Sequence, residues 1–237
     1  MTDINYDEIW PGGPRFVKSD KSFKMSTDSV LLSYFAETKG AMLGCDLGCG
    51  GGAISVLMCH NNPRLTIHGV ELDTAAVEVA RKNAHINYMN DKLKICHQDI
   101  RGNVLGAGRY DIVVTNPPYF PQGSGGEHSS FASSRDERNC TLSDVCTAAS
   151  RLLRCGGKMC MVHRPDRLSE IFCTMTSNAI EPKRLMLVHA TAESEPSLIL
   201  LEGRRGGKPG LKIEKPLIMR NSDGTESDIL KEIYHKE

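Results

Sequence analysis

Short apolar runs alternate with longer amphipathic stretches through the middle of the chain. Runs of about four to eight apolar positions have the length of β-strands, and apolar residues spaced three or four apart are typical of helices. This alternation predicts βαβ units and a mostly parallel sheet flanked by helices. The expected strands are 41–46, 65–71, 93–97, 110–115, 158–163, 184–190 and 197–202, and the expected helices are 53–60, 74–87, 142–153 and 165–178.

The connections between these elements also carry information. Residues 122–139 are polar and rich in glycine and serine, and a connection of that length is typical of a lid or a binding loop. The pair Gly156-Gly157 is predicted to end the helix 142–153. No internal repeat or linker divides the chain. We therefore expect a cap segment 1–40, a domain 41–203, and a basic extension 204–237 packed on that domain.

A glycine-dense turn, residues 48–52, joins the first expected strand to the first helix. Glycines at such a turn allow a ligand to approach the backbone and leave helix N-terminal amides free for a polar group. Glu71 ends the second strand, where a carboxylate can accept hydrogen bonds from ribose hydroxyls. Together they indicate a nucleoside-containing ligand, and the glycine spacing alone also fits a nicotinamide dinucleotide.

Two further acids favour S-adenosylmethionine (SAM) over a dinucleotide. Asp46 precedes the glycines, where it is placed to meet the amino group of the methionine part, and a nicotinamide cofactor has no cation there. Asp99 follows the third strand, where it is placed to contact an adenine amine. An acid in that position is equally typical of a turn.

The tetrapeptide Asn116-Pro117-Pro118-Tyr119 ends the fourth strand, at the edge where open α/β sheets bind their ligands. The exocyclic amine of a purine is weakly nucleophilic, because its lone pair is delocalised into the ring. The Asn116 side-chain oxygen and the Pro117 carbonyl can accept hydrogen bonds from that amine and aim its nitrogen at a sulfonium methyl group. Two prolines stiffen the turn, and Tyr119 offers a ring on which a base can stack. The motif predicts methyl transfer to a planar nitrogen.

These motifs resemble the class I SAM-dependent amino-methyltransferases that carry an Asn-Pro-Pro-Tyr signature. The matching segments are 46–50, 70–73 and 116–120. Further segments are similar to the bacterial tRNA1(Val) adenine-37 N6-methyltransferases, so the resemblance covers almost the whole chain; they are Arg15-Phe16, 24–32, 203–212 and 216–218. The sequence departs from that family at Ser29, where glycine is expected, and at 134–137.

The resemblance implies a Rossmann-like class I methyltransferase fold with a seven-stranded sheet, SAM as the cofactor, and methylation of N6 of adenine 37 in tRNA1(Val). The residues implied to bind the cofactor are Lys24, Thr27, Asp28, Asp46, Gly48, Gly50, Glu71, Asp99 and Asn116. Those expected to be catalytic are Asn116, Pro117 and Tyr119. Those expected to bind the substrate are Pro118, Tyr119, Phe120, Arg135, Arg204, Arg205 and Lys208.

Other functions are compatible with parts of this pattern. A protein-glutamine N5-methyltransferase or an rRNA amino-methyltransferase uses the same tetrapeptide. The first of these usually carries a separate helical substrate domain, for which residues 1–40 leave little room. An NAD-dependent oxidoreductase fits the glycine turn but gives no role to residues 116–119, and a non-catalytic binding module gives no reason for intact amine acceptors.

Composition and charge change this picture little. The 29 Lys and Arg equal the 29 Asp and Glu, so contacts with tRNA phosphates depend on local basic clusters. Nine cysteines without Cys-x-x-Cys spacing and eight scattered histidines predict reduced thiols and no metal. The N-terminus has no signal-peptide pattern, and no apolar run is long enough for a membrane span. We expect a cytoplasmic protein that is a monomer or a weak dimer.

Overall fold

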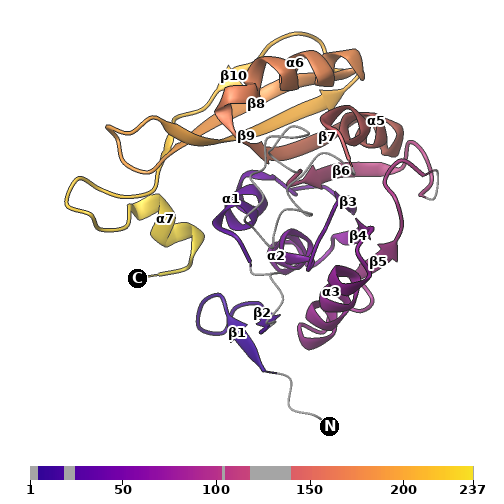
Figure 1. Cartoon of the computed structure of the whole chain (residues 1–237), viewed down its shortest axis with the longest axis horizontal. Helices are drawn as coiled ribbons and strands as arrows, with labels where there is room; N and C mark the ends of the chain where they lie inside the picture. Colours follow the sequence, from indigo (N-terminus) through magenta and orange to yellow (C-terminus); the bar gives the residue numbers. More distant parts are fainter. Residues whose placement is uncertain (1–4, 19–24, 103–104, 118–139, 237) are drawn as a thin grey trace, which may run out of the picture.

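The computed structural model describes residues 5–18, 25–102, 105–117 and 140–236. They form a central sheet with the strand order β5-β4-β3-β6-β7-β9-β8 (Figure 1). The strands are β3 (Leu43–Leu47), β4 (Thr66–Glu71), β5 (Leu93–His97), β6 (Tyr110–Thr115), β7 (Leu153–His163), β8 (Ile180–His189) and β9 (Pro196–Arg205). Only β9 is antiparallel to its neighbours in this order. The predicted mostly parallel, seven-stranded sheet is confirmed, and β10 (Lys212–Ile213) and β11 (Leu217–Ile218) are added along β8.

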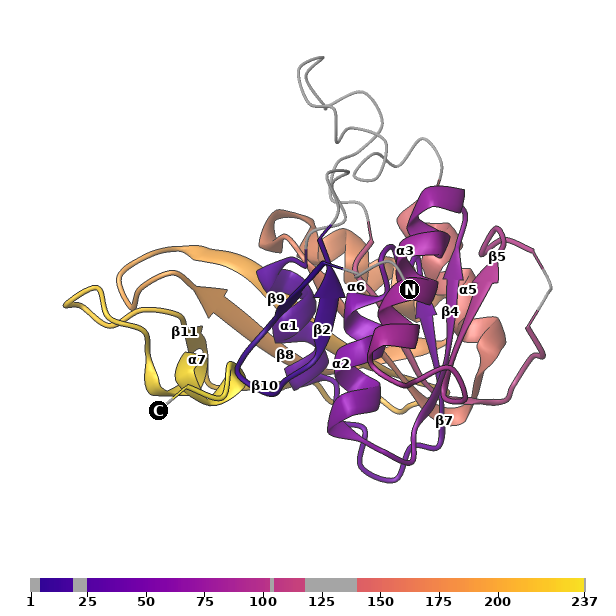
Figure 2. The same cartoon turned by 90° about the horizontal axis from the view of Figure 1, so that it is seen from below.

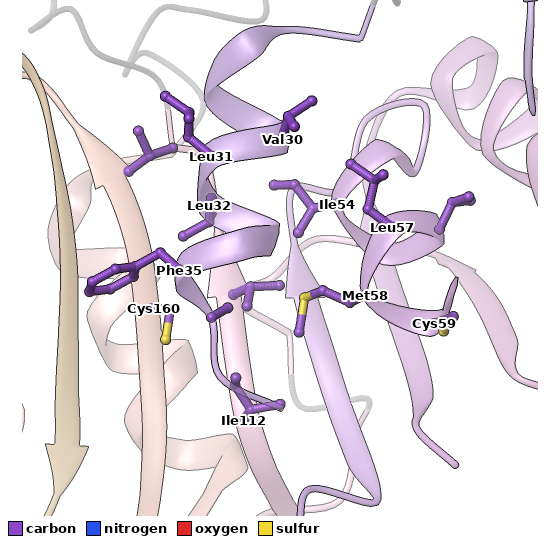
Figure 3. Packing of buried hydrophobic residues seen from close by; sticks show 14 of the residues in the cluster. Val30, Leu31, Leu32, Phe35, Ile54, Leu57, Met58, Cys59, Ile112 and Cys160 are labelled. Carbon is purple, nitrogen blue, oxygen red and sulfur yellow. The ribbon is translucent and has the colours of Figure 1, made fainter. Parts of the chain in front are cut away.

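Helices cover both faces of the sheet (Figure 1). One face carries α1 (Thr27–Phe35), α2 (Ala53–Asn61) and α3 (Thr74–Ile86), and the other carries α5 (Leu142–Leu152), a short 3₁₀ helix (Pro165–Arg167) and α6 (Leu168–Ser177). Figure 3 shows α1 packed against α2 and the sheet, with Val30 beside Ile54 and Leu57. The two hydrophobic cores share the sheet because successive strand residues, such as Ile112 and Val113, face opposite sides. No helix in the described ranges is long and apolar enough to cross a membrane.

Two terminal elements lie outside the main sheet. The N-terminal strands β1 (Tyr6–Glu8) and β2 (Arg15–Val17) form an antiparallel hairpin, and α7 (Asp228–Ile233) lies near the C-terminus. Figure 2 shows this C-terminal segment, in yellow, at the β8 end of the molecule. Trp10 and His235 bring the two terminal regions together, with ring centroids 4.3 Å apart. They line a cavity of about 270 Å³ that also contacts α1 and α2 but none of the predicted site residues.

One predicted boundary is wrong. The pair Gly156-Gly157 does not end a helix, because α5 ends at Leu152 and the next residue already begins β7. The glycines lie where the β6–β7 register shifts between Tyr110 and Ile112. A Cβ at Gly157 would lie 3.0 Å from the carbonyl oxygens of Tyr110 and Arg154, and Gly156 has a φ of 75°. The pair is therefore a β-bulge, which needs glycine for space and for left-handed backbone.

Candidate active site

Most of the predicted site residues that the structure describes lie at one edge of the sheet. Parallel strands end at a common edge, and the register places Leu47 opposite both Val70 and Thr115. The Thr115 hydroxyl donates a hydrogen bond to the Leu47 carbonyl over 3.0 Å, so the residues that follow, Gly48 and Asn116, lie on adjacent strand ends. The acids at this carboxyl edge are Asp46 in β3, Glu71 at the end of β4 and Asp99 beyond β5.

The glycine loop between β3 and α2 is shaped to receive a ligand. Gly48, Gly50 and Gly52 have φ values of 68°, 52° and 80°, in the left-handed region that favours glycine. A Cβ at Gly48 or Gly50 would meet no atom within 4 Å, whereas one at Gly52 would lie 3.3 Å from the Ala80 side chain. The first two glycines thus border open space, and the third allows α3 to pack closely. Gly52 caps α2 without a side chain, so first-turn amides of α2 can face a polar ligand.

Glu71 organises this loop as well as offering an acceptor. Its Oε2 accepts a hydrogen bond of 2.9 Å from the Gly50 N–H, and its Oε1 accepts bonds from the Leu72 and Asp73 N–H groups. A carboxylate oxygen accepts about two hydrogen bonds, so these three bonds from described residues leave one acceptor position, on Oε2. This position fits one ribose hydroxyl. The sequence indicated the ribose contact but not the bonds that shape the loop.

Asp46 is a fully buried acid with one hydroxyl partner. Its Oδ2 accepts a hydrogen bond of 2.6 Å from Ser55 in α2, while Oδ1 has no hydrogen-bond partner among the described residues. Burial raises the pKa of Asp46 to about 7. An unsatisfied buried acceptor is unfavourable by about 1–3 kcal/mol. The ammonium group of a methionine moiety would supply both a donor and a compensating charge, so Asp46 and the glycine loop fit SAM.

Asp99 is engaged by Arg101 in an exposed turn. Its Oδ1 accepts hydrogen bonds from the Arg101 backbone N–H over 2.9 Å and from the Arg101 Nε over 3.0 Å. These bonds to Arg101 hold the pKa of Asp99 below its ordinary value. The turn geometry matches the alternative interpretation of this acid, and contact with an adenine amine stays a prediction.

The catalytic turn is described in part. Asn116 is half-buried and Pro117 is buried at the end of β6. Five predicted site residues lie outside the described ranges, namely Lys24, Pro118, Tyr119, Phe120 and Arg135.

Thr27 and Asp28 form the first turn of α1, whose N-cap is Ser26. Helix α1 runs from the level of the α2 N-terminus toward the start of β3, so its first turn lies at the carboxyl edge (Figure 3). Ser29, which replaces the expected glycine, is buried, and its hydroxyl lies 3.1 Å from that of Ser26.

The predicted basic contacts lie elsewhere. Strand β9 is antiparallel to β7 and pairs Arg204 with Lys158, so its C-terminal end lies at the amino edge of the sheet. Arg204, Arg205 and Lys208 are therefore at the edge opposite Asn116. The Arg205 guanidinium donates to the Leu153 carbonyl, which gives it a structural partner. The structure does not bring these residues to the site, and their contact with substrate stays a prediction.

Two residues of the site escaped the sequence analysis. Ser55 binds Asp46, and Asn83 of α3 donates a hydrogen bond of 2.8 Å to the Gly51 carbonyl. Both are polar residues buried on otherwise apolar helix faces, with exposed fractions of 0% and 3%. A polar residue in an apolar stripe is the signal that identifies such positions, because a buried polar group needs a partner.

The fold and the site define a Rossmann-like class I methyltransferase. A model of the "Methyltransferase small domain" family matches residues 19–177. A solved structure, a predicted O-methyltransferase from Agrobacterium tumefaciens, has the same fold with a TM-score of 0.72, at 18% identity over 88% of this chain and 96% of that one.

Curated relatives define the family more narrowly. A tRNA1(Val) (adenine(37)-N6)-methyltransferase from Dickeya chrysanthemi is 31% identical over 88% of this chain and 85% of the relative. A relative of the same name from Porphyromonas gingivalis is 28% identical over 77% of this chain and 75% of the relative. The chain belongs to the methyltransferase small-domain family and, within it, to the tRNA1(Val) (adenine(37)-N6)-methyltransferase family. It is a SAM-dependent methyltransferase, as predicted.

Proposed function

We propose that this protein methylates N6 of an adenine in tRNA, namely adenine 37 of tRNA1(Val). The name of the relatives supports the substrate. The observation that carries the proposal is the position of Asn116 and Pro117 directly beside the glycine loop, across the Thr115–Leu47 hydrogen bond. The acceptors for an amine and the loop that fits SAM thus end adjacent strands.

The proposed chemistry needs orientation more than a strong base. Bound SAM supplies an electrophilic methyl group. The Asn116 side-chain oxygen and the Pro117 carbonyl oxygen accept hydrogen bonds from the two N–H groups of the adenine amine. These bonds direct the nitrogen lone pair toward the cofactor side of the turn and stabilise positive charge on the amine. The methylated amine is acidic enough to release its proton to water.

The test is methyl transfer from labelled SAM to unmodified tRNA1(Val), bulk tRNA, ribosomal RNA and a release factor in separate reactions. We expect N6-methyladenosine at position 37 of tRNA1(Val), identified by nucleoside mass spectrometry.

Asn116→Ala is expected to lower kcat by about a hundredfold, since preorganised hydrogen bonds of this kind contribute about that much. Asn90→Ala, which changes an exposed asparagine away from the carboxyl edge, is the matched control.

Label in ribosomal RNA or on a glutamine of the release factor, with none in tRNA, would contradict tRNA as the substrate. It would agree with the assignment of the protein as a methyltransferase. Full activity of Asn116→Ala on tRNA would contradict the proposed role of the turn.

A further inference from the structure

The hairpin β1–β2 turns an unpaired strand edge toward α3 (Figure 1). Phe16 lies opposite Asp7 in β1, and the residues on either side of it, Arg15 and Val17, direct their backbone N–H groups away from β1. Exposed strand edges leave donors and acceptors unsatisfied. Here the partner of that edge is a helix rather than a third strand.

Asn83 of α3 and Asn87, the C-cap of that helix, form the hydrogen bonds that this strand edge lacks. The Arg15 N–H donates to Asn87 Oδ1 and the Val17 N–H donates to Asn83 Oδ1, each over 2.8 Å. Asn87 Nδ2 also donates to the Arg15 carbonyl over 2.7 Å. Residues four apart in a helix are about 6 Å apart along its axis, and residues two apart in a strand are about 6.6 Å apart. The spacing of the two asparagines therefore matches the spacing of the outward-facing strand amides.

Asn83 has a second contact that Asn87 lacks. Its Nδ2 donates to the Gly51 carbonyl over 2.8 Å, whereas the second Nδ2 contact of Asn87 is with the Asn83 carbonyl of its own helix. One carboxamide, 3% exposed, thus joins the N-terminal hairpin to the glycine loop.

This contact fixes a peptide plane in the glycine loop. The Gly51 carbonyl and the Gly52 N–H belong to one rigid peptide unit, and that N–H donates to the Cys49 carbonyl over 2.8 Å. On the other side, the Gly50 N–H is held by Glu71. Glu71 and Asn83 therefore restrain the peptide units on either side of the Gly50–Gly51 peptide, in a loop whose glycines would otherwise be free to change conformation.

We propose that Asn83 is a positioning residue that couples docking of the β1–β2 hairpin to the SAM-binding conformation of the glycine loop. A hairpin docked on Asn83 Oδ1 holds the carboxamide in the orientation that donates to Gly51, and an ordered loop holds it in the orientation that accepts from Val17. The coupling rests on the proposed function only in that SAM is the ligand of the loop, and it is independent of the methyl acceptor.

The experiment compares Asn83→Ala with Asn87→Ala. Both remove an asparagine that binds the same strand from the same side of α3, and only the first removes a contact with the loop. We expect the Kd for SAM, measured by calorimetry, to rise about tenfold for Asn83→Ala and less than about threefold for Asn87→Ala. In methyl transfer, the KM for SAM should rise by a larger factor than kcat falls for Asn83→Ala, because Asn83 orients the loop and does not touch the reacting atoms.

A second measurement needs no variant. Coupling between two sites is reciprocal, so SAM should slow hydrogen exchange at the Val17 amide of the wild-type protein. The Lys231 amide, which donates to the Ser227 carbonyl in α7, is the reference and should change much less. In Asn83→Ala the effect of SAM on Val17 should disappear.

Equal increases in Kd for the two variants, or no slowing at Val17 relative to Lys231, would overturn the proposed role of Asn83 in the coupling. These readouts use SAM binding alone. Wild-type protein that binds SAM but leaves tRNA unlabelled would contradict the proposed substrate, while the coupling would still be decided by the Kd values and the exchange rates.

Discussion

At the residue scale, Asp46 is a residue that destabilises the folded protein at neutral pH and is expected to strengthen the binding of SAM. The carboxyl group is buried beneath the glycine loop, and only one of its oxygens has a partner among the described residues. Burial raises its pKa from the ordinary value of 3.8 to about 7. The folded protein thus binds this proton more tightly than the unfolded chain does. The stability that Asp46 contributes is present below about pH 4 and is lost as the pH rises to about 7.

Replacing this acid should stabilise the protein and weaken SAM binding. The pKa difference corresponds to at most about 4 kcal/mol, so Asp46→Asn should increase the free energy of unfolding at pH 8 by up to that amount. The variant should also lose the part of the decline between pH 4 and pH 7 that this acid causes. Urea unfolding at pH 5 and pH 8 measures both effects.

The same variant should raise the Kd for SAM by at least about tenfold, because an amide lacks the charge that attracts an ammonium group. Asp91→Asn, an exchange at an exposed position, is the control for both properties. Unchanged SAM affinity in Asp46→Asn would contradict the assignment of Asp46 to the methionine ammonium group.

At the scale of elements, the Gly156-Gly157 bulge lies inside β7 and shifts the register in which β7 pairs with β6. Gly157→Ala would bring a Cβ to 3.0 Å from two backbone oxygens, which cannot move as the end of a side chain can. We expect a loss of about 1–3 kcal/mol in the free energy of unfolding, typical of overpacking. Thermal or urea unfolding measures it.

Gly156→Ala is the matched comparison, since a Cβ there would meet no atom within 4 Å and only its φ of 75° is unfavourable. Its loss should be smaller, about 1–2 kcal/mol for a left-handed alanine. If Gly157→Ala is as stable as the wild-type protein, the bulge does not require glycine.

The hydrophobic periodicity of the sequence predicted the long strands that carry the site, but not the short strand β2 or the tertiary contacts that hold the glycine loop. The predicted strands 93–97 and 110–115 coincide with β5 and β6, because apolar runs bounded by turn residues are a local property of the sequence. Strands of three residues, such as β2, have no period to detect. The two bonds of Asn83 join segments 66 and 32 residues away in the chain, and such tertiary partners are not encoded in a local pattern.

At the scale of the whole molecule, the catalytic turn and the basic cluster of Arg204, Arg205 and Lys208 lie at opposite edges of the sheet. The register places Thr115 level with Met161 of β7 and Leu201 of β9, so about 13 Å along a strand separates the start of the turn from Arg205. With equal numbers of acidic and basic residues, the protein has no net charge to attract RNA. Binding of tRNA at both edges therefore requires a substrate long enough to extend from one to the other.

The position of the basic cluster outside the catalytic edge predicts that it contributes more to the binding of a whole tRNA than to that of a short hairpin. The exposed Arg204 and Lys208 are exchanged together for glutamine, and Arg205 is kept because it binds the Leu153 carbonyl. For whole tRNA, KM should rise, and the slope of log KM against log salt should fall by about 0.9 for each phosphate that the variant no longer neutralises. For an isolated anticodon stem-loop, which carries fewer phosphates than a whole tRNA, KM should rise by a smaller factor. The Kd for SAM should stay unchanged with either substrate. Lys82→Gln, an exposed lysine of α3, is the control. Equal KM values for whole tRNA in variant and wild type would contradict a contact between the basic cluster and the substrate.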